Sequence, residues 1–452
     1  MRLRILFILL ATVVLLTGCS NFGMNAEDLM RPPKLSAEQQ NIYSALSAAI
    51  GEEILLKYPQ EGEFRSAFIM NDIDYDGEEE ALVFYTTAAG GNVRLNILDR
   101  RGDKWYSMYD GVGLGPEVTS ISFPYITRND RNNIVVSFDL LSRKQKKLCV
   151  YSFKDSKLIE EFSADYTDCI IQDFDGDNRA ELFLLYKVYD LQIAKASLVD
   201  TLFNIGPLTV MNEIDLSPEV SEYVKLSVEH RVEEGKEGAA VKEYYNICID
   251  GRSSGGSYYT EVVGISNNTL TNRLDQFAMK ATLRSTALMT QDRNHDGIMD
   301  IPAGIAIQNW SIASEESPVK LIQWYNYIDD ALLPTTHTLI HETFGFSLDY
   351  PPSWNGTNIS VKEQSDGFEW RIYEFDAHLA DQDGYDEKGV GPELLRIRVY
   401  QNNDYFDNTS AEGYSRIGGN EEYVYYARLP ETEVSAENMQ IGWDELVSLF
   451  HF

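Results

Sequence analysis

Asp173-Phe-Asp175-Gly-Asp177-Asn-Arg-Ala-Glu181 is a nine-residue stretch with acidic side chains at its first, third, fifth and ninth positions. Carboxylates crowded on so short a loop repel one another, and calcium, with about six to eight oxygen ligands, relieves that repulsion. A plain solvated turn is the alternative for one such stretch. Two further stretches share the spacing, with one Asn in place of an acid: Asp72-Ile-Asp74-Tyr-Asp76-Gly-Glu-Glu-Glu80 and Asp292-Arg-Asn294-His-Asp296-Gly-Ile-Met-Asp300. This recurrence favours Ca²⁺, and its expected role is structural.

Short β-branched and aromatic runs flank every loop, and residues 63–343 are a succession of such runs between Gly, Asn and Asp turns. This pattern predicts strands. A degenerate copy of the loop ends at Asn133, with Tyr125, Thr127 and Asn129 where the acids stand elsewhere, and is expected to bind no metal. The gap between 181 and 300 leaves room for a further unit over 244–265. About five repeats predict a mainly β, β-propeller-like domain.

The loops differ from helix-loop-helix calcium sites, whose loops end in a Glu at position 12. That position holds Val83, Leu184 and Ala303. The loops instead resemble the calcium loops of FG-GAP and VCBS-type repeats, as in integrin-like propeller blades. The resemblance covers roughly residues 63–320, although the Phe-Gly…Gly-Ala-Pro element between blades is missing. It implies these metal ligands: Asp72, Asp74, Asp76, Glu80, Asp173, Asp175, Asp177, Glu181, Asp292, Asn294, Asp296 and Asp300.

The N-terminus carries the features of an export signal. Arg2 and Arg4 precede an apolar run over 5–16 that is too short to span a bilayer. Residues 1–18 are therefore predicted to be a signal peptide, with an uncleaved anchor as the alternative. The Leu16-Thr-Gly-Cys19 sequence resembles a bacterial lipobox, which implies lipid on Cys19 and an extracytoplasmic protein anchored to a bacterial membrane.

The remaining segments complete the expected organisation. Residues 19–35 are predicted to be a lipidated tether, and 36–62 to contain a helix that begins at a capping box, Ser36-Ala-Glu-Gln39, and packs on the repeats. Residues 344–452 are predicted to be a small α+β domain with a last helix over roughly 436–450. This segment resembles, more weakly, the PsbP/Mog1-like domains, which bind partners more often than they catalyse.

Charge and motifs narrow the class of function. The formal charge is −33, and loss of Arg2 and Arg4 with the signal peptide makes it −35, so nucleic acid is a poor partner. Three cysteines remain after Cys19, and free buried thiols are expected for them. The sequence contains no catalytic motif, although paired carboxylates for glycoside hydrolysis depend on the fold. We therefore expect a binding module for an envelope protein or glycan, with a polysaccharide-active enzyme and an envelope assembly factor as alternatives.

Overall fold

The computed structural model describes residues 35–141, 145–202, 206–233, 242–307, 318–364, 366–375, 390–402, 413–430 and 439–452. The signal peptide, Cys19 and nearly all of the tether lie outside these residues. The chain divides into two compact units, one of Met1–Val118 with Lys154–Lys157 and one of Thr119–Phe153 with Leu158–Phe452. Within the described residues, no helix is long and apolar enough to cross a membrane.

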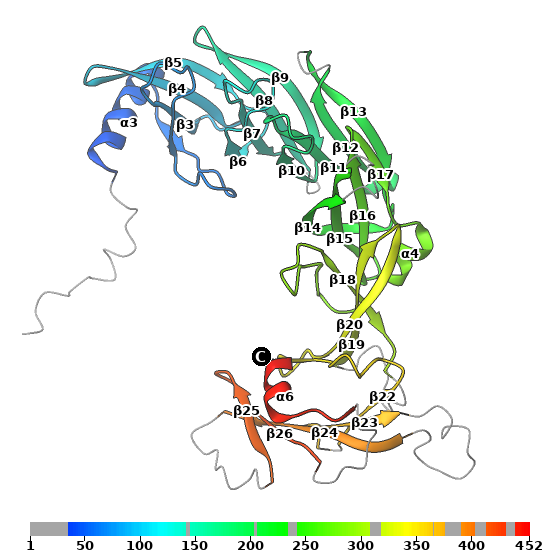
Figure 1. Ribbon diagram of the computed structural model, residues 1–452. Helices are drawn as coiled ribbons and strands as arrows, with labels where there is room; N and C mark the ends of the chain where they lie inside the picture. The colour runs from blue at the N-terminus through cyan, green and yellow to red at the C-terminus, as the bar shows by residue number, and fades with distance from the viewer. Residues whose placement is uncertain are drawn as a thin grey trace, which may run out of the picture. The chain divides into compact units, whose positions relative to one another are not determined.

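The described residues of the first unit include helix α3 and an antiparallel sheet, here called sheet A (Figure 1). The capping box is confirmed, because the Gln39 amide N–H donates to Ser36 Oγ and Ser36 N–H donates to Gln39 Oε1. Strands β1 and β2 pair with successive parts of the same edge of β3. The elements are α3 (Ala37–Ile50), β1 (Ile54–Leu56), β2 (Phe68–Asn71), β3 (Glu80–Thr87), β4 (Arg94–Arg101) and β5 (Lys104–Val112).

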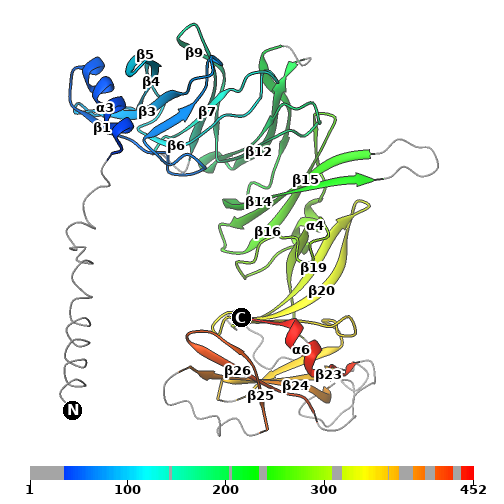
Figure 2. The ribbon, with the colours of Figure 1, turned by 60° about the vertical axis from the view of Figure 1, so that its left-hand side comes forward.

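Three further four-stranded antiparallel sheets follow in chain order. Sheet B contains β6 (Glu117–Ser122), β7 (Ile134–Asp139), β8 (Lys146–Lys154) and β9 (Lys157–Tyr166). Sheet C contains β10 (Asp168–Gln172), β11 (Glu181–Val188), β12 (Ile193–Thr201) and β13 (Leu208–Asp215), with the short 3-10 helix η1 (Tyr189–Leu191) between β11 and β12. Sheet D contains β14 (Val220–Glu233), β15 (Lys242–Ser253), β16 (Tyr258–Ser266) and β17 (Thr269–Asn272). Sheet D is the further unit expected between 181 and 300, and its long β14–β15 hairpin is clear in Figure 2.

Sheet E repeats the pattern with additions. Its order is β18 (Asp300–Ile305), β19 (Val319–Ile328), β20 (Ala331–His341), β21 (Phe346–Asp349) and β27 (Phe450–His451). An isolated bridge between Gln291 and Asp300 stands where the other sheets have their first strand. Before it lies the short helix α4 (Gln276–Ala281).

Apolar side chains fill the space between successive sheets of the second unit. Neighbouring residues of β11 point to opposite faces, as the pleat requires. Leu182 and Leu184 pack with Val135 of sheet B, while Phe183 and Leu185 pack with Ile247 of sheet D. A strand buried on both faces needs a continuous apolar run, which is why the runs after the acidic loops lack alternation. The expected fold class, a mainly β repeat of blade-like sheets, is confirmed.

The C-terminal segment forms sheet F and shares a core with sheet E. Sheet F has the order β22 (Ile359–Glu363), β23 (Glu369–Phe375), β24 (Val390–Gln401), β26 (Tyr423–Arg428) and β25 (Ser415–Gly419). Trp370 and Ile397 of sheet F pack in one cluster with Leu321 and Leu348 of sheet E. The last helix is shorter than predicted: α6 spans Trp443–Leu449 with Gly442 as its N-cap, and Phe450 pairs with Leu348 as part of β27. Residues 431–438, which include its predicted start, lie outside the described part.

The three cysteines of the described residues are free, as expected. Cys149 and Cys248 are buried, while Cys169 is half-buried. Burial raises the pKa of the Cys149 thiol to about 11, because it disfavours the thiolate. These thiols are packing residues in strands.

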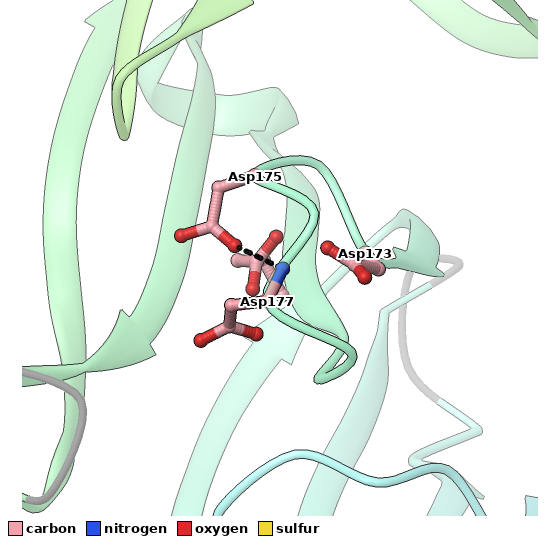
Figure 3. A group of neighbouring side chains, drawn as sticks. Asp173, Asp175 and Asp177 are labelled. Carbon is pink, nitrogen blue, oxygen red and sulfur yellow. Dashed lines mark hydrogen bonds between the residues drawn. The ribbon is translucent and has the colours of Figure 1, made fainter. Parts of the chain in front are cut away.

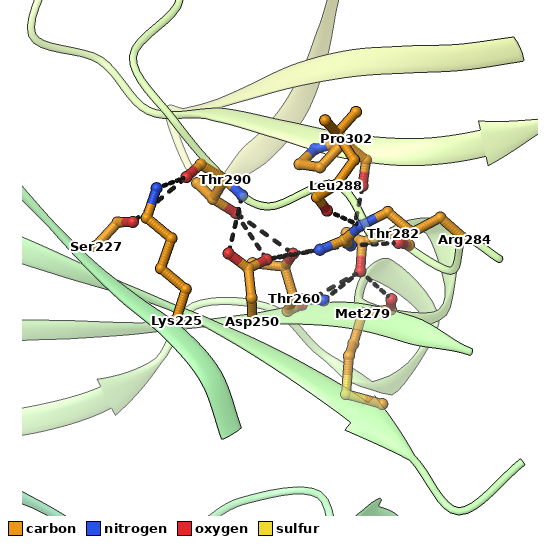
Figure 4. Close-up of polar contacts among 10 residues, drawn as sticks. All are labelled: Lys225, Ser227, Asp250, Thr260, Met279, Thr282, Arg284, Leu288, Thr290 and Pro302. Atoms are coloured by element: carbon orange, nitrogen blue, oxygen red, sulfur yellow. Dashed lines mark hydrogen bonds and ion pairs between the residues drawn. The ribbon is translucent and has the colours of Figure 1, made fainter. Parts of the chain in front are cut away.

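A fully buried ion pair joins sheet D to the segment before sheet E (Figure 4). Arg284 Nη2 donates to Asp250 Oδ1 over 2.7 Å, and both side chains have an exposed fraction of 0%. Thr290 adds its N–H to Asp250 Oδ2 and its hydroxyl to Oδ1. The guanidinium also donates to the carbonyl oxygens of Leu288 and Pro302. The pair thus fixes the chain on both sides of the third acidic loop.

We expect Arg284→Met to lower the free energy of unfolding by about 3–5 kcal/mol, because it leaves the Asp250 carboxylate buried without its cation. Urea unfolding followed by circular dichroism measures this change. Arg252→Met changes an exposed cation of sheet D, the sheet that holds Asp250. It serves as the matched control and should leave the unfolding midpoint nearly unchanged. Equal effects of the two substitutions would show that the buried Asp250–Arg284 pair contributes no more to the free energy of unfolding than an exposed cation does.

Candidate metal sites in the acidic loops

The second acidic loop connects the first two strands of sheet C. Asp173 follows the last residue of β10, and Glu181 is the first residue of β11. Gln172 and Glu181 are register partners, so the strand pairing closes the loop at its base. The nine residues must therefore reverse direction in a compact turn, which brings their side chains together.

Each carboxylate of this loop accepts hydrogen bonds from backbone N–H groups further along it. Asp173 accepts from Gly176 through Oδ1 at 2.6 Å and from Asn178 through Oδ2 at 2.9 Å. Asp175 Oδ1 accepts from Asp177 N–H, the bond drawn in Figure 3, and Asp177 Oδ1 accepts from Arg179 N–H. These bonds hold the three aspartates in a compact turn, and Asp177 Oδ2 also accepts from Arg179 Nε at 2.9 Å.

The first and third loops repeat this bonding. Asp72 accepts from the N–H groups of Tyr75 and Gly77. Asp292 likewise accepts from Asp296 and Gly297. The fourth and sixth positions are left-handed in all three loops, and glycine occupies one of them in each: Tyr75 (φ 66°), Gly77 (94°), Gly176 (79°), Asn178 (65°), His295 (60°) and Gly297 (82°).

The ninth position is buried and bonds to the second. Glu181 Oε2 accepts from Phe174 N–H at 2.6 Å, and Glu80 Oε2 accepts from Ile73 N–H at 2.9 Å. The other oxygen of each carboxylate, Oε1, is buried and has no hydrogen-bond partner, while the exposed fractions are 0% for Glu181 and 1% for Glu80. A buried carboxylate oxygen without a donor is costly, and a cation satisfies it.

The predicted ligands come together in two of the three loops. One oxygen each from Asp173, Asp175, Asp177 and Glu181 lies within 4.8 Å of every other. Asp72, Asp74 and Glu80 form the equivalent group in the first loop. Asp76 stands outside that group, although its Oδ1 accepts from Glu78 N–H as the fifth position does elsewhere.

The third loop is arranged differently at its ninth position. Asp300 Oδ2 accepts from Arg293 N–H, but its Oδ1 accepts from the Asn326 amide at 3.1 Å and is therefore satisfied. Asn294 donates its own amide to Asp296 Oδ2 at 2.9 Å. Within the described residues, these side chains do not form a close group of acids like the other two. From this geometry we expect the third loop to bind a cation more weakly than the other two loops.

The degenerate loop keeps the ninth-position bond without the acids. Asn133 Oδ1 accepts from the N–H groups of Ile126 and Thr127, at 3.2 and 2.9 Å. Arg128 and Asp130 form an ion pair where the left-handed positions stand in the other loops. The ninth residue thus makes this bond in sheets A, B, C and E, which the search for acids did not reveal.

Sequence patterns did not single out two further residues, Asn246 and Arg179. Asn246 of β15 is buried and donates its amide to Glu229 Oε1 at 3.2 Å, in a sequence context like that of Asn133. The similarity of Asn246-Ile-Cys-Ile to Asn133-Ile-Val-Val was the available signal. Arg179 forms an ion pair with Asp177, so one acid of the second loop already has a cationic neighbour.

The loops also connect sheets, through the N–H group at their eighth position. Ala180 N–H donates at 2.6 Å to the carbonyl of Tyr125, which lies in the degenerate loop between β6 and β7 of sheet B. Met299 N–H donates to Glu229 Oε2 of sheet D at 2.7 Å. A loop held in its compact shape therefore holds the neighbouring sheet as well.

Burial and mutual repulsion disfavour ionisation of these carboxylates when no cation is bound. Desolvation first, and then the neighbouring acids, raise the pKa of Glu181 to about 8 and that of Glu80 to about 7. The pKa values of Asp74 and Asp175 are raised for the same reasons. A bound divalent cation would lower these pKa values, because it favours the charged forms of the carboxylates.

A cavity of about 600 Å³ lies elsewhere, between sheet E and the segment 351–357. Its lining includes the aromatic side chains of Tyr325, His337 and Trp354, together with the hydroxyls of Thr335 and Thr357. Among its described lining residues there is no Asp or Glu, so it does not supply the carboxylate pair that glycoside hydrolysis requires.

Comparisons with known proteins leave the family of the chain open. No protein-family model matches the sequence, and no curated protein matches it. Among solved structures, the chain is similar to the WD40 domain of SCAP from fission yeast, with 12% identity, 71% of each chain covered and a TM-score of 0.28. At this TM-score we draw no conclusion from the likeness.

We expect the metal-free protein to lose stability as the pH rises from about 5 to about 8. The pKa of Glu181 is about 8 in the folded state against a usual value of 4.5, so the folded state keeps a proton that the unfolded state releases in this window. Thermal unfolding in EGTA at a series of pH values measures the loss. Glu181→Gln should reduce it, whereas Glu78→Gln, at an exposed loop position, should not. An identical pH profile for wild type and Glu181→Gln would contradict the assignment.

Proposed function

We propose that this protein is a calcium-stabilised, blade-repeat binding module that a lipid on Cys19 holds on the outer side of a bacterial membrane. The observation that carries the calcium assignment is the pair of buried, unpartnered oxygens, Glu80 Oε1 and Glu181 Oε1, each beside the aspartates of its own loop. Neither oxygen has a protein donor, and each belongs to a group of acids that no described cation fully neutralises.

The chemistry of the donor set favours calcium over other metals. Each group supplies carboxylate oxygens from a flexible turn, whereas zinc prefers His and Cys ligands. Magnesium requires near-ideal octahedral geometry and keeps several waters, which suits a crowded, partly buried carboxylate group poorly. Calcium modules outside the cell commonly bind at about 10⁻⁴–10⁻³ M, so permanent structural occupancy fits the extracytoplasmic location inferred from the lipobox.

The proposed binding role rests on the contacts between sheets that bound calcium would hold in place. The loops bond to adjacent sheets through Ala180 and Met299, so an ion in a loop would fix the spacing of two blades as well as the turn. A rigid stack of sheets with surface loops is a scaffold suited to binding, although one fold serves many functions. The partner we propose is a protein or glycan of the cell envelope.

Calcium should raise the thermal unfolding midpoint of the mature chain, with magnesium and EGTA as controls. Binding to the folded state alone stabilises it by about 1 kcal/mol per site when calcium exceeds the dissociation constant several-fold. Asp173→Ala and Asp72→Ala should each remove part of the rise. Asp292→Ala should remove little, because Asp300 is already satisfied in the third loop.

Two results of that experiment would contradict the proposal. A midpoint unchanged by millimolar calcium would leave the loops as plain acidic turns. An equal response to magnesium would show general charge screening. Glu181→Gln keeps the shape of the side chain and the acceptor for Phe174 N–H, so it separates loss of the charge from loss of the fold.

Cys19→Ser should move the protein from the membrane fraction to the soluble fraction, because a lipidated cysteine is the proposed anchor. Fractionation of cells that express each form, with metabolic fatty-acid labelling, measures this. Cys149→Ser, at a buried thiol of sheet B, is the matched control and should leave the distribution unchanged. Membrane retention of the Cys19→Ser protein would favour an uncleaved N-terminal anchor.

A further inference from the structure

The cavity beside sheet E has the size of a small-molecule site. Its volume is about 600 Å³, and such pockets commonly measure about 300–1,000 Å³. One wall comes from β18, β19 and β20, and the other from the segment 351–357 between β21 and β22. We call it the sheet E cavity. None of the predicted metal ligands, all of which are described, is among its lining residues, so a ligand bound here would be held by other groups.

A β-bulge shapes the first wall of the cavity. The single residue Trp324 of β19 stands opposite both Thr335 and Thr336 of β20. Bulges bend a strand and redirect its side chains, and they are common next to functional sites. Gln323 holds this bulge, because its amide donates to the carbonyl oxygens of Trp324 at 2.8 Å and of Thr336 at 3.0 Å. Gln323, Thr335 and Thr336 all line the cavity, so the bulge supplies polar groups to it.

The second wall is fixed against the first. Gly356 N–H donates to His337 Nε2 at 3.2 Å, and a Cβ at Gly356 would lie only 2.6 Å from Ile305 Cδ1. The Trp354 indole N–H donates to the Met439 carbonyl at 2.8 Å, which fixes the ring in the wall. Both walls are therefore in place before a ligand binds, and such preorganisation lowers the entropic cost of binding.

The lining of the cavity is uncharged, although 24% of the residues of the chain are Asp, Glu, Lys or Arg. None of these four residue types is among the described lining residues. Burial lowers the pKa of His337, and its Nε2 accepts the Gly356 N–H, so this ring is neutral at pH 7. A charged ligand would leave water without finding an opposite charge, which is costly. The cavity therefore favours a neutral ligand.

Polar groups of the lining remain available to such a ligand. Within the described part of the chain, the Tyr325 hydroxyl, the side-chain N–H groups of Asn355 and the side-chain carbonyl of Gln323 make no hydrogen bond with the protein. The Asn355 oxygen, in contrast, accepts from the N–H groups of Thr357 at 2.9 Å and Asn358 at 3.1 Å, which fixes the side chain. The cavity thus offers both donors and acceptors beside aromatic rings.

We infer that the sheet E cavity binds a short neutral saccharide. Each sugar hydroxyl both donates and accepts, so a sugar uses all three kinds of free group, and its C–H faces pack on aromatic side chains. A proline-rich peptide also docks on aromatic-lined sites, but proline has no N–H and would leave the Gln323 carbonyl unpaired. The inference rests on the proposed binding function and names its ligand as a glycan, but it does not depend on calcium.

The test uses the detergent-solubilised full chain and the neutral disaccharides cellobiose, maltose and N,N′-diacetylchitobiose, followed by saturation-transfer NMR. At least one disaccharide should bind, with an affinity that does not change with salt, because no charge takes part. Tyr325→Phe should weaken binding about fivefold, because it removes one hydroxyl and keeps the ring. Tyr106→Phe, at an exposed ring of β5, is the matched control and should bind like wild type.

A second variant blocks the cavity. Thr335→Trp places a large side chain at an exposed position of the lining and should abolish binding. Thr269→Trp makes the same change at an exposed position of β17, where the threonine hydroxyl also donates to a backbone carbonyl, and should leave binding intact. Circular dichroism of both variants checks that the fold is kept.

Several outcomes would overturn the inference. These are no saturation transfer to any of the disaccharides, equal binding by wild type and Thr335→Trp, equal weakening by Tyr106→Phe, and tighter binding of a proline-rich peptide or of a carboxylated disaccharide. The calcium-induced rise in unfolding midpoint should persist in Tyr325→Phe and Thr335→Trp. Loss of sugar binding with that rise intact reports on the cavity, whereas absence of the rise in wild type reports on the calcium loops.

Discussion

The bond from a ninth-position side chain to a second-position N–H is the contact on which the blades depend. It occurs at Glu80, Asn133, Glu181 and Asp300, at the start of the second strand of four sheets. The bond closes a nine-residue turn at its base, and the register of the first strand pair follows from the closed turn. Because the side chain is buried, the loop cannot open without exposing the end of the strand.

The proposed calcium chemistry would be an addition to this contact in two of the blades. Asn133 makes the bond with an amide, and the degenerate loop has an ion pair in place of the acidic group. Glutamate makes it with one oxygen and leaves the second oxygen buried beside the aspartates. Asp300 gives that second oxygen to Asn326. The same backbone contact thus occurs in three electrostatic settings, and among these four described side chains only the glutamates keep a buried oxygen without a donor.

Charge is distributed unevenly in this acidic protein. Acids gather in turns, where a metal would neutralise them, and the basic residues of the C-terminal segment gather on one sheet face. The fully buried Asp250–Arg284 pair is the balanced case, since each charge has its partner and several further hydrogen bonds. In the acidic loops, crowded carboxylates without a counter-charge lower stability. A bound ligand of opposite charge would offset this cost.

Local pattern was enough to predict the loops, the strands around them and the helix at Ala37–Ile50, because acids at fixed spacing, apolar runs and a capping box act over a few residues. The hidden repeat was also visible in the sequence. Tertiary structure alone decided which ninth-position side chains keep an oxygen without a donor, since Asn326, which donates to Asp300, lies far from it along the chain. It also decided that Phe450 would leave the last helix to pair with Leu348. The alignment of Lys362, Arg371, Arg396 and Arg428 depends on the register of four strands, and register is a property of their pairing that no single segment carries.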